Sequence, residues 1–260
     1  MNILLYFFVV LAATTLGAAT GMGGGVIIKP ALDVLGDFPA ETIAALSSAA
    51  VLTMSIVSVG RHIKAKTGLA PKLAIYLATG ALAGGSIGNR MLIRLAGNWA
   101  DHQVKVVQNA VLAALLVITF VYMLRKDFIK SRQLAGPPGG CLTGLGLGIC
   151  SSFLGIGGGP VNVAVITYLF SMPTNAAAVY SLITILFAQI SKMAALFLRG
   201  EITRLLVPVL PALLVAAVLG GWIGASFNRK LSPKVLGILF NAVQVLVFFI
   251  CVYNIVSYSL

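Results

Sequence analysis

The chain has 260 residues, of which 59% are hydrophobic and only 9% are charged. This is far more apolar surface than one soluble core buries, which excludes an ordinary water-soluble enzyme or binding domain. The formal charge of +12 does not indicate a nucleic-acid partner, because the Lys and Arg residues fall in short connectors between apolar runs without interleaved aromatic residues.

The predicted elements are all helical and run through the whole chain. The first, residues 3–36, is apolar but broken by glycines, and it is too long for one perpendicular membrane span. Three ordinary spans follow, and a second glycine-broken segment covers residues 141–172. Five apolar runs are long enough to cross about 30 Å of hydrocarbon: residues 40–60, 104–124, 175–198, 205–227 and 233–260. The fold class predicted is an all-α polytopic membrane protein.

The sequence contains an internal repeat. GMGGG at Gly21 to Gly25 returns as GIGGG at Gly155 to Gly159, an offset of 134 residues. Other pairs keep that offset within two residues: Phe38-Pro39 with Met172-Pro173, Ser47 with Ser181, Gly68 with Gly200, Gly84 and Gly88 with Gly220 and Gly224, and Asn109 with Asn241. We therefore predict two membrane repeats, residues 1–133 and 134–260. Because the first broken segment has an internal counterpart, we expect it to be retained rather than cleaved as a signal peptide.

Two topologies are compatible with the repeat. If each broken segment folds back as a hairpin, each half crosses the membrane an odd number of times and the halves are inverted. If each crosses once, the halves are parallel. In the inverted arrangement, eleven of the Lys and Arg residues in the connectors lie on one side of the membrane and five on the other; in the parallel arrangement the numbers are ten and six. Both arrangements obey the positive-inside rule, and the larger difference slightly favours the inverted one.

The two glycine motifs are the main candidates for a binding site. A helix that breaks inside a membrane needs protein or water to satisfy its backbone, so such breaks concentrate at functional sites. The residues after each motif can start a new half-helix, with Pro160 well suited to the first turn. Amides at such N-termini bind anions. The predicted site glycines are Gly21, Gly23, Gly24 and Gly25 with Gly155, Gly157, Gly158 and Gly159. For Gly84, Gly88, Gly220 and Gly224 we expect close helix packing instead.

Three charged residues lie within the apolar segments. Lys29 needs a partner there, and Asp33 at i+4 shares its helical face. The pair is either structural, or Lys29 lends its charge to an anion and Asp33 acts as its counter-ion or as a proton carrier, which makes Asp33 the candidate coupling residue. Lys192 stands about two helical turns before Arg199, and we expect it to reach the membrane interface rather than to have a role in substrate binding.

Uncharged donors complete the predicted site. Asn162 follows the second motif, and Ser47 and Ser181 occupy equivalent positions in the two halves. We place all three among the substrate-binding residues. Asn109, Asn241 and Gln244 either line the cavity or form hydrogen bonds between helices. The three cysteines have no metal-ligand spacing and sit in apolar segments, so we predict neither a metal site nor a disulfide framework, and no cofactor.

The two glycine motifs, Pro30, and the stretch Met172-Pro173-x-Asn175-Ala176 resemble the sulfite exporter TauE/SafE family of bacterial permeases. The resemblance covers essentially the whole chain. It implies export of sulfite or a related organosulfur anion such as an organosulfonate across the bacterial inner membrane. It also implies a small anionic substrate and the lipid bilayer as partners, with a homodimer left open.

Three other functions compete with anion transport. An intramembrane enzyme is disfavoured, because the sequence has no HExxH or GxSxG motif and no acidic pair placed for acid-base chemistry. An intramembrane scaffold or cofactor-assembly protein would not require two internal breaks. An anion channel of the same fold stays open, since alternating access cannot be inferred from one sequence.

Overall fold

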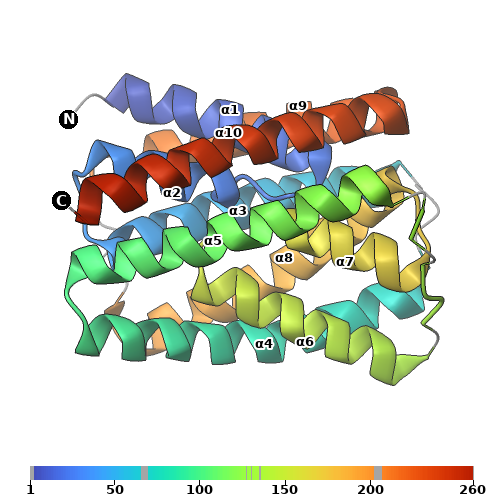
Figure 1. Cartoon of the computed structure of the whole chain (residues 1–260), viewed down its shortest axis with the longest axis horizontal. Coiled ribbons are helices and arrows are strands. Elements are labelled where there is room, and N and C mark those ends of the chain that lie inside the picture. The colour runs from blue at the N-terminus through green and yellow to red at the C-terminus, as the bar shows by residue number, and fades with distance from the viewer. Residues whose placement is uncertain are drawn as a thin grey trace.

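A computed structural model describes residues 3–65, 70–126, 128–129, 131–134, 136–201 and 207–259, and within them the chain is helical, with no strand. Figure 1 shows the helices packed lengthwise in one bundle. Lys66, Gly68, Lys130, Arg204 and Leu205, which the sequence analysis used, lie outside the described residues. The helices are α1 (Ile3–Thr20), α2 (Gly25–Leu35), α3 (Ala40–Lys64), α4 (Pro71–Asn98), α5 (Asp101–Arg125), α6 (Pro137–Phe153), α7 (Pro160–Phe170), α8 (Thr174–Leu198), α9 (Leu210–Lys230) and α10 (Pro233–Ser259).

Six of these helices are long and apolar enough to cross a membrane: α1, α3, α5, α8, α9 and α10. Five of the six coincide with the apolar runs predicted from the sequence, and α1 is the first part of the broken segment. Helix α4 has 28 residues, which at 1.5 Å per residue gives about 42 Å. The chain is therefore a multi-pass membrane protein.

Both glycine-broken segments are helical hairpins. The first is interrupted between α1 and α2, and the second between α6 and α7, where the sequence predicts the breaks. In Figure 1, α1 starts on the left beside the N-terminus and α2 returns to the left, whereas α6 starts on the right and α7 returns to the right. The two hairpins therefore enter the bundle from opposite ends, and each break lies inside it.

The hairpins are held by glycines on the neighbouring long helices. A Cβ atom on Gly84 would lie 2.2 Å from Leu145 O, and one on Gly220 would lie 2.0 Å from Thr14 Oγ1. Helix α4 thus packs directly on α6, and α9 packs on α1. This confirms that Gly84 and Gly88 on α4, and Gly220 and Gly224 on α9, serve close helix packing.

The same partnerships occur in both halves of the chain. Helix α1 of the first hairpin packs on α9, as α6 of the second hairpin packs on α4. In the same way, α3 packs on α9 and α8 packs on α4. Helices α3 and α8 also pack on each other, as do α5 and α10. Most of α3 is buried, and every residue of the stretch Ile43–Val51 in its first half is buried. This places α3 and α8 in the middle of the bundle, against both breaks.

Candidate functional site

The two glycine breaks contact each other inside the bundle. A Cβ atom on Gly23 would lie 2.9 Å from Gly157 O, and one on Gly25 would lie 2.0 Å from Ile156 O. Gly23 and Gly157 both have positive φ, at 73° and 66°. The two glycine breaks are therefore too close for a side chain to fit between them. The left-handed backbone conformation also requires glycine at Gly23 and Gly157.

Each break rests on the long helix of the other half. A Cβ atom on Gly21 would lie 2.3 Å from Ala178 Cα of α8, and one on Gly155 would lie 2.8 Å from Ala44 Cβ of α3. Ala44 and Ala178 are separated by 134 residues, as are the two glycines, so the contacts are reciprocal. Ser181 Oγ donates a hydrogen bond of 2.5 Å to Gly21 O. This bond fixes the first break to α8.

The second break presents unused backbone donors. Gly157, Gly158 and Gly159 are buried, and within the described part of the chain their amides donate no hydrogen bond. Gly159 is the N-cap of α7, and Pro160, the first residue of that helix, has no N–H. Buried amides that are left unpaired are rare in proteins. Together with the positive end of the α7 dipole they form a cradle suited to an anion.

Several buried side chains around the breaks also lack a hydrogen-bond partner. Asn162 Nδ2 and Ser47 Oγ are unpaired among the described residues, and each residue is at most 1% exposed. Asn162 Nδ2 lies 3.3 Å from the Cβ position of Gly158, and Ser47 Oγ lies 2.9 Å from that of Gly25. Both groups can donate a hydrogen bond to an oxyanion. The remaining predicted glycine, Gly24, is the N-cap of α2 and packs on α1.

Gln189 belongs to the same cluster; in the sequence it is an uncharged donor within an apolar segment, and it was not among the predicted substrate-binding residues. It comes from α8 and is fully buried. Its Nε2 atom lies 3.1 Å from the Cβ position of Gly157, while its Oε1 atom has no partner in the described structure. Gln189 follows Ser181 by eight residues, so both lie on the same side of α8. That spacing was the signal available in the sequence.

The predicted ion pair between Lys29 and Asp33 is present. Lys29 Nζ lies 2.7 Å from Asp33 Oδ2, and both side chains are almost fully buried. One helical turn separates Lys29 from the first residue of α2, Gly25. The pair leaves little net charge at this position. The alternative, in which Lys29 offers its charge to a bound anion, stays a prediction.

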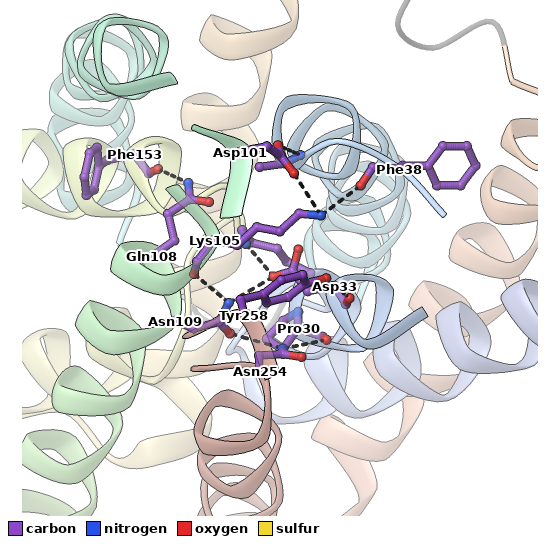
Figure 2. Close-up of polar contacts among 12 residues, drawn as sticks. Pro30, Asp33, Phe38, Asp101, Lys105, Gln108, Asn109, Phe153, Asn254 and Tyr258 are labelled. Atoms are coloured by element: carbon purple, nitrogen blue, oxygen red, sulfur yellow. Dashed lines mark hydrogen bonds and ion pairs between the residues drawn. The ribbon is translucent and has the colours of Figure 1, made fainter. Parts of the chain in front are cut away.

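A polar network extends from this pair (Figure 2). Asn109 of α5 donates a hydrogen bond of 3.1 Å to Asp33 Oδ2, and the Tyr258 hydroxyl of α10 donates to Asp33 O. Asn254 of α10 donates to Pro30 O at 3.0 Å and to Asn109 Oδ1 at 3.3 Å. Asp33 Oδ1, however, has no hydrogen-bond partner among the described residues. Side chains of α5 and α10 therefore surround this turn of α2, and the Asp33 carboxylate, which accepts from Lys29 and Asn109, retains a free acceptor oxygen.

Lys192 does not lie where the sequence analysis expected it. Instead of reaching the membrane interface, Lys192 is only 2% exposed. Its Nζ atom donates to Ala44 O at 3.2 Å and lies 3.8 Å from the Cβ position of Gly155. The prediction was wrong because α3 and the second break cover this side of α8, which leaves the lysine no route to the interface.

The sequence comparisons agree with this architecture. Residues 6–250 match the family described as sulfite exporter TauE/SafE, so the chain belongs to that family of membrane transporters and is not an enzyme. The chain is also similar to the probable membrane transporter protein YunE of Bacillus subtilis (strain 168), with 24% identity over 256 residues, covering 91% of this chain and 92% of the relative. No solved structure matches.

Proposed function

We propose that this transporter carries a small sulfur oxyanion, sulfite or an organosulfonate, and that it binds the anion where the two glycine breaks meet. The observation that carries the proposal is the set of buried donors without acceptors at that point: the amides of Gly157 to Gly159, Asn162 Nδ2 and the Ser47 hydroxyl. An oxyanion accepts hydrogen bonds and donates few or none, so it matches this set. Ser181 supports the site by fixing Gly21.

The two halves, residues 1–133 and 134–260, act in this proposal as inverted repeats that share one site. Three features support that arrangement: the hairpins enter from opposite ends (Figure 1), the helix partnerships recur in both halves, and the glycine contacts with α3 and α8 are reciprocal. In transporters with inverted repeats the substrate binds near the bilayer midplane, between the repeats. Alternating access then consists of one hairpin and its supports moving against the other.

The basic residues orient the proposed arrangement in the bacterial inner membrane. Eleven Lys and Arg residues belong to the connectors α3–α4, α5–α6 and α9–α10, and five belong to the connectors at the opposite end. The positive-inside rule places the first end in the cytoplasm. Export then requires the site to open first toward that end.

A topology test checks this orientation. Both chain ends lie on the left in Figure 1, at the end of the bundle opposite the last turn of α3 and the first turn of α4. We expect a cysteine added at either terminus to react in intact cells with a membrane-impermeant maleimide. A cysteine in the α3–α4 connector is expected to react only after the cells are permeabilised. Labelling of the two termini on different sides would exclude inverted halves.

Asp33 is the proposed coupling residue. Its carboxylate is buried, has one free oxygen and is paired with Lys29. Binding of a proton to Asp33 would release the Lys29 ammonium, which would then be free to attract the anion toward the break. Proton and anion binding would thereby favour each other, as proton–anion symport requires.

Reconstitution tests the proposed substrate. Purified protein in liposomes is expected to take up labelled sulfite and methanesulfonate faster than empty liposomes do, and an imposed proton gradient is expected to change the rate. Carboxylates of the same size serve as the comparison, because they share the charge but not the three-oxygen head group. If neither sulfite nor methanesulfonate is taken up, with or without the proton gradient, the proposed function is refuted.

A further inference from the structure

Lys192 is a buried cation that has no counter-ion among the described residues. No carboxylate of the described residues lies within ion-pair distance of its Nζ atom, whose one hydrogen bond runs to Ala44 O. Burying an ammonium group in this way costs several kcal/mol unless a charged partner is supplied. Lys29, by contrast, is matched by Asp33 at 2.7 Å. Within the described part of the chain, Lys192 is therefore the buried cation at the two breaks whose charge is not compensated.

The position of Lys192 connects this charge to the second break. Its ammonium lies 3.8 Å from the Cβ position of Gly155, the first glycine of the motif. Gln189, three residues earlier on α8, reaches the Cβ position of Gly157 at 3.1 Å. One face of α8 thus provides a charge and an amide along the same short stretch of backbone whose own amides at Gly157 to Gly159 are unpaired.

A second observation concerns the space around the lysine. Lys192, Asn89 and Ala44 line a cavity of about 10 Å³, which is also lined by the half-buried Glu41 and Glu201. That volume accommodates about one water molecule and is too small for an oxyanion. The structure is thus closed around Lys192, and anion entry requires the second hairpin to move relative to α3 and α8.

We propose that Lys192 is the residue that neutralises the substrate, and that the site consequently selects a monoanion. The inference rests on the proposed function, since it assigns a charge partner to the same anion. While Asp33 is ionised it cancels the charge of Lys29, and in that state the site offers one unbalanced positive charge and a group of neutral donors. A sulfonate or hydrogensulfite, with one negative charge, is then balanced on binding, whereas a dianion such as sulfate retains a buried uncompensated charge.

The test compares anion binding by three variants of the full-length protein in detergent. Lys192→Met removes the charge at similar length, Lys192→Arg keeps it, and Lys126→Met is the matched control. Lys126 Nζ also donates one hydrogen bond of 3.2 Å to a neutral acceptor, Thr174 Oγ1, but outside the site. The probes are sodium methanesulfonate, sodium sulfite and sodium sulfate at equal ionic strength. The readout is the rise in melting temperature with ligand concentration.

We expect the parent and Lys126→Met to bind methanesulfonate with equal affinity and to bind sulfate at least about tenfold more weakly. Lys192→Met is expected to lose about tenfold or more of its affinity for methanesulfonate, and Lys192→Arg to retain most of it. Without ligand, Lys192→Met should melt at a higher temperature than the parent, because an uncompensated buried charge has been removed. A lysine with a merely structural role would lower both stability and binding on replacement.

The outcomes separate the two proposals. If the parent binds neither methanesulfonate nor sulfite, the proposed function itself fails. If the parent binds methanesulfonate and Lys192→Met binds it equally well, the function stands and the role of Lys192 is overturned. If Lys192→Met loses affinity but the parent binds sulfate as tightly as methanesulfonate, the selection for a monoanion is overturned.

Discussion

Replacing Gly23 with leucine is expected to abolish anion transport in liposomes while folded protein still reaches the membrane. The Cβ atom of the new residue would lie 2.9 Å from Gly157 O and 3.0 Å from Ile185 Cδ1. The rest of the side chain would fill the point where the two breaks meet, which blocks both the anion and any movement of one hairpin against the other. Transport is measured as uptake of labelled sulfite.

Gly36→Leu is the matched control for this substitution. Gly36 has φ 70°, close to the 73° of Gly23, but no atom lies within 4 Å of its Cβ position. Both variants therefore carry the same backbone strain, about 1–2 kcal/mol, and only Gly23→Leu obstructs the site. We expect Gly36→Leu to transport nearly as well as the parent. Equal transport by the two variants would show that the contact between the breaks has no role in transport.

Much of the architecture was predictable because its causes are local or repetitive. Glycines in the left-handed region and Pro160 at the first turn of α7 determine where the helices break, and both are visible as sequence motifs. The internal repeat extends this to tertiary contacts: the offset that pairs Gly21 with Gly155 also pairs Ala178 with Ala44, against which these glycines pack. The ion pair of Lys29 with Asp33 follows from their i, i+4 spacing.

The polar cluster around the breaks was predicted only in part. Ser47, Ser181 and Asn162 were identified through the repeat and their closeness to a motif. Lys192 and Gln189 have no such signal, because burial depends on which elements cover a given face of α8, and that is decided by packing rather than by the helix itself. Ser181 and Lys192 are eleven residues apart, about 20° around the helix at 100° per residue. This spacing, with the eight residues between Ser181 and Gln189, is the sequence indication of a shared face.

The hydrogen-bond network around Asp33 could not be predicted from the sequence, for a different reason. Asn254 and Tyr258 lie more than 220 residues from the groups on α2 that they contact. The sequence predicts α10 as a span but gives no rotation for it about its axis. Which of its polar residues point inward is set by its packing on α5 and α2. Figure 2 shows that this packing directs both side chains at the same turn of α2.

Neutralising both members of the buried pair is expected to restore stability that either single substitution removes. Lys29→Gln leaves the Asp33 carboxylate buried without its cation, and Asp33→Asn leaves the ammonium alone, so each should cost about 3–5 kcal/mol. In the double variant Asn109 can still donate to the amide oxygen at position 33. A double-mutant cycle from thermal or denaturant unfolding in detergent measures the coupling. Additive losses would show that the two side chains do not interact energetically.

The same double variant tests the coupling role of Asp33. With no carboxylate to take up a proton, it should bind methanesulfonate with an affinity close to that of the parent, yet a proton gradient should no longer accelerate uptake. Lys105 and Asp101 provide the control, because they form another i, i+4 pair, at 3.0 Å, in which the Asp101 side chain is 48% exposed. Neutralising that pair should cost much less stability and leave the response to the gradient intact. If the variant without Lys29 and Asp33 still responds to the gradient as the parent does, the pair is structural, and the proton is carried by another group.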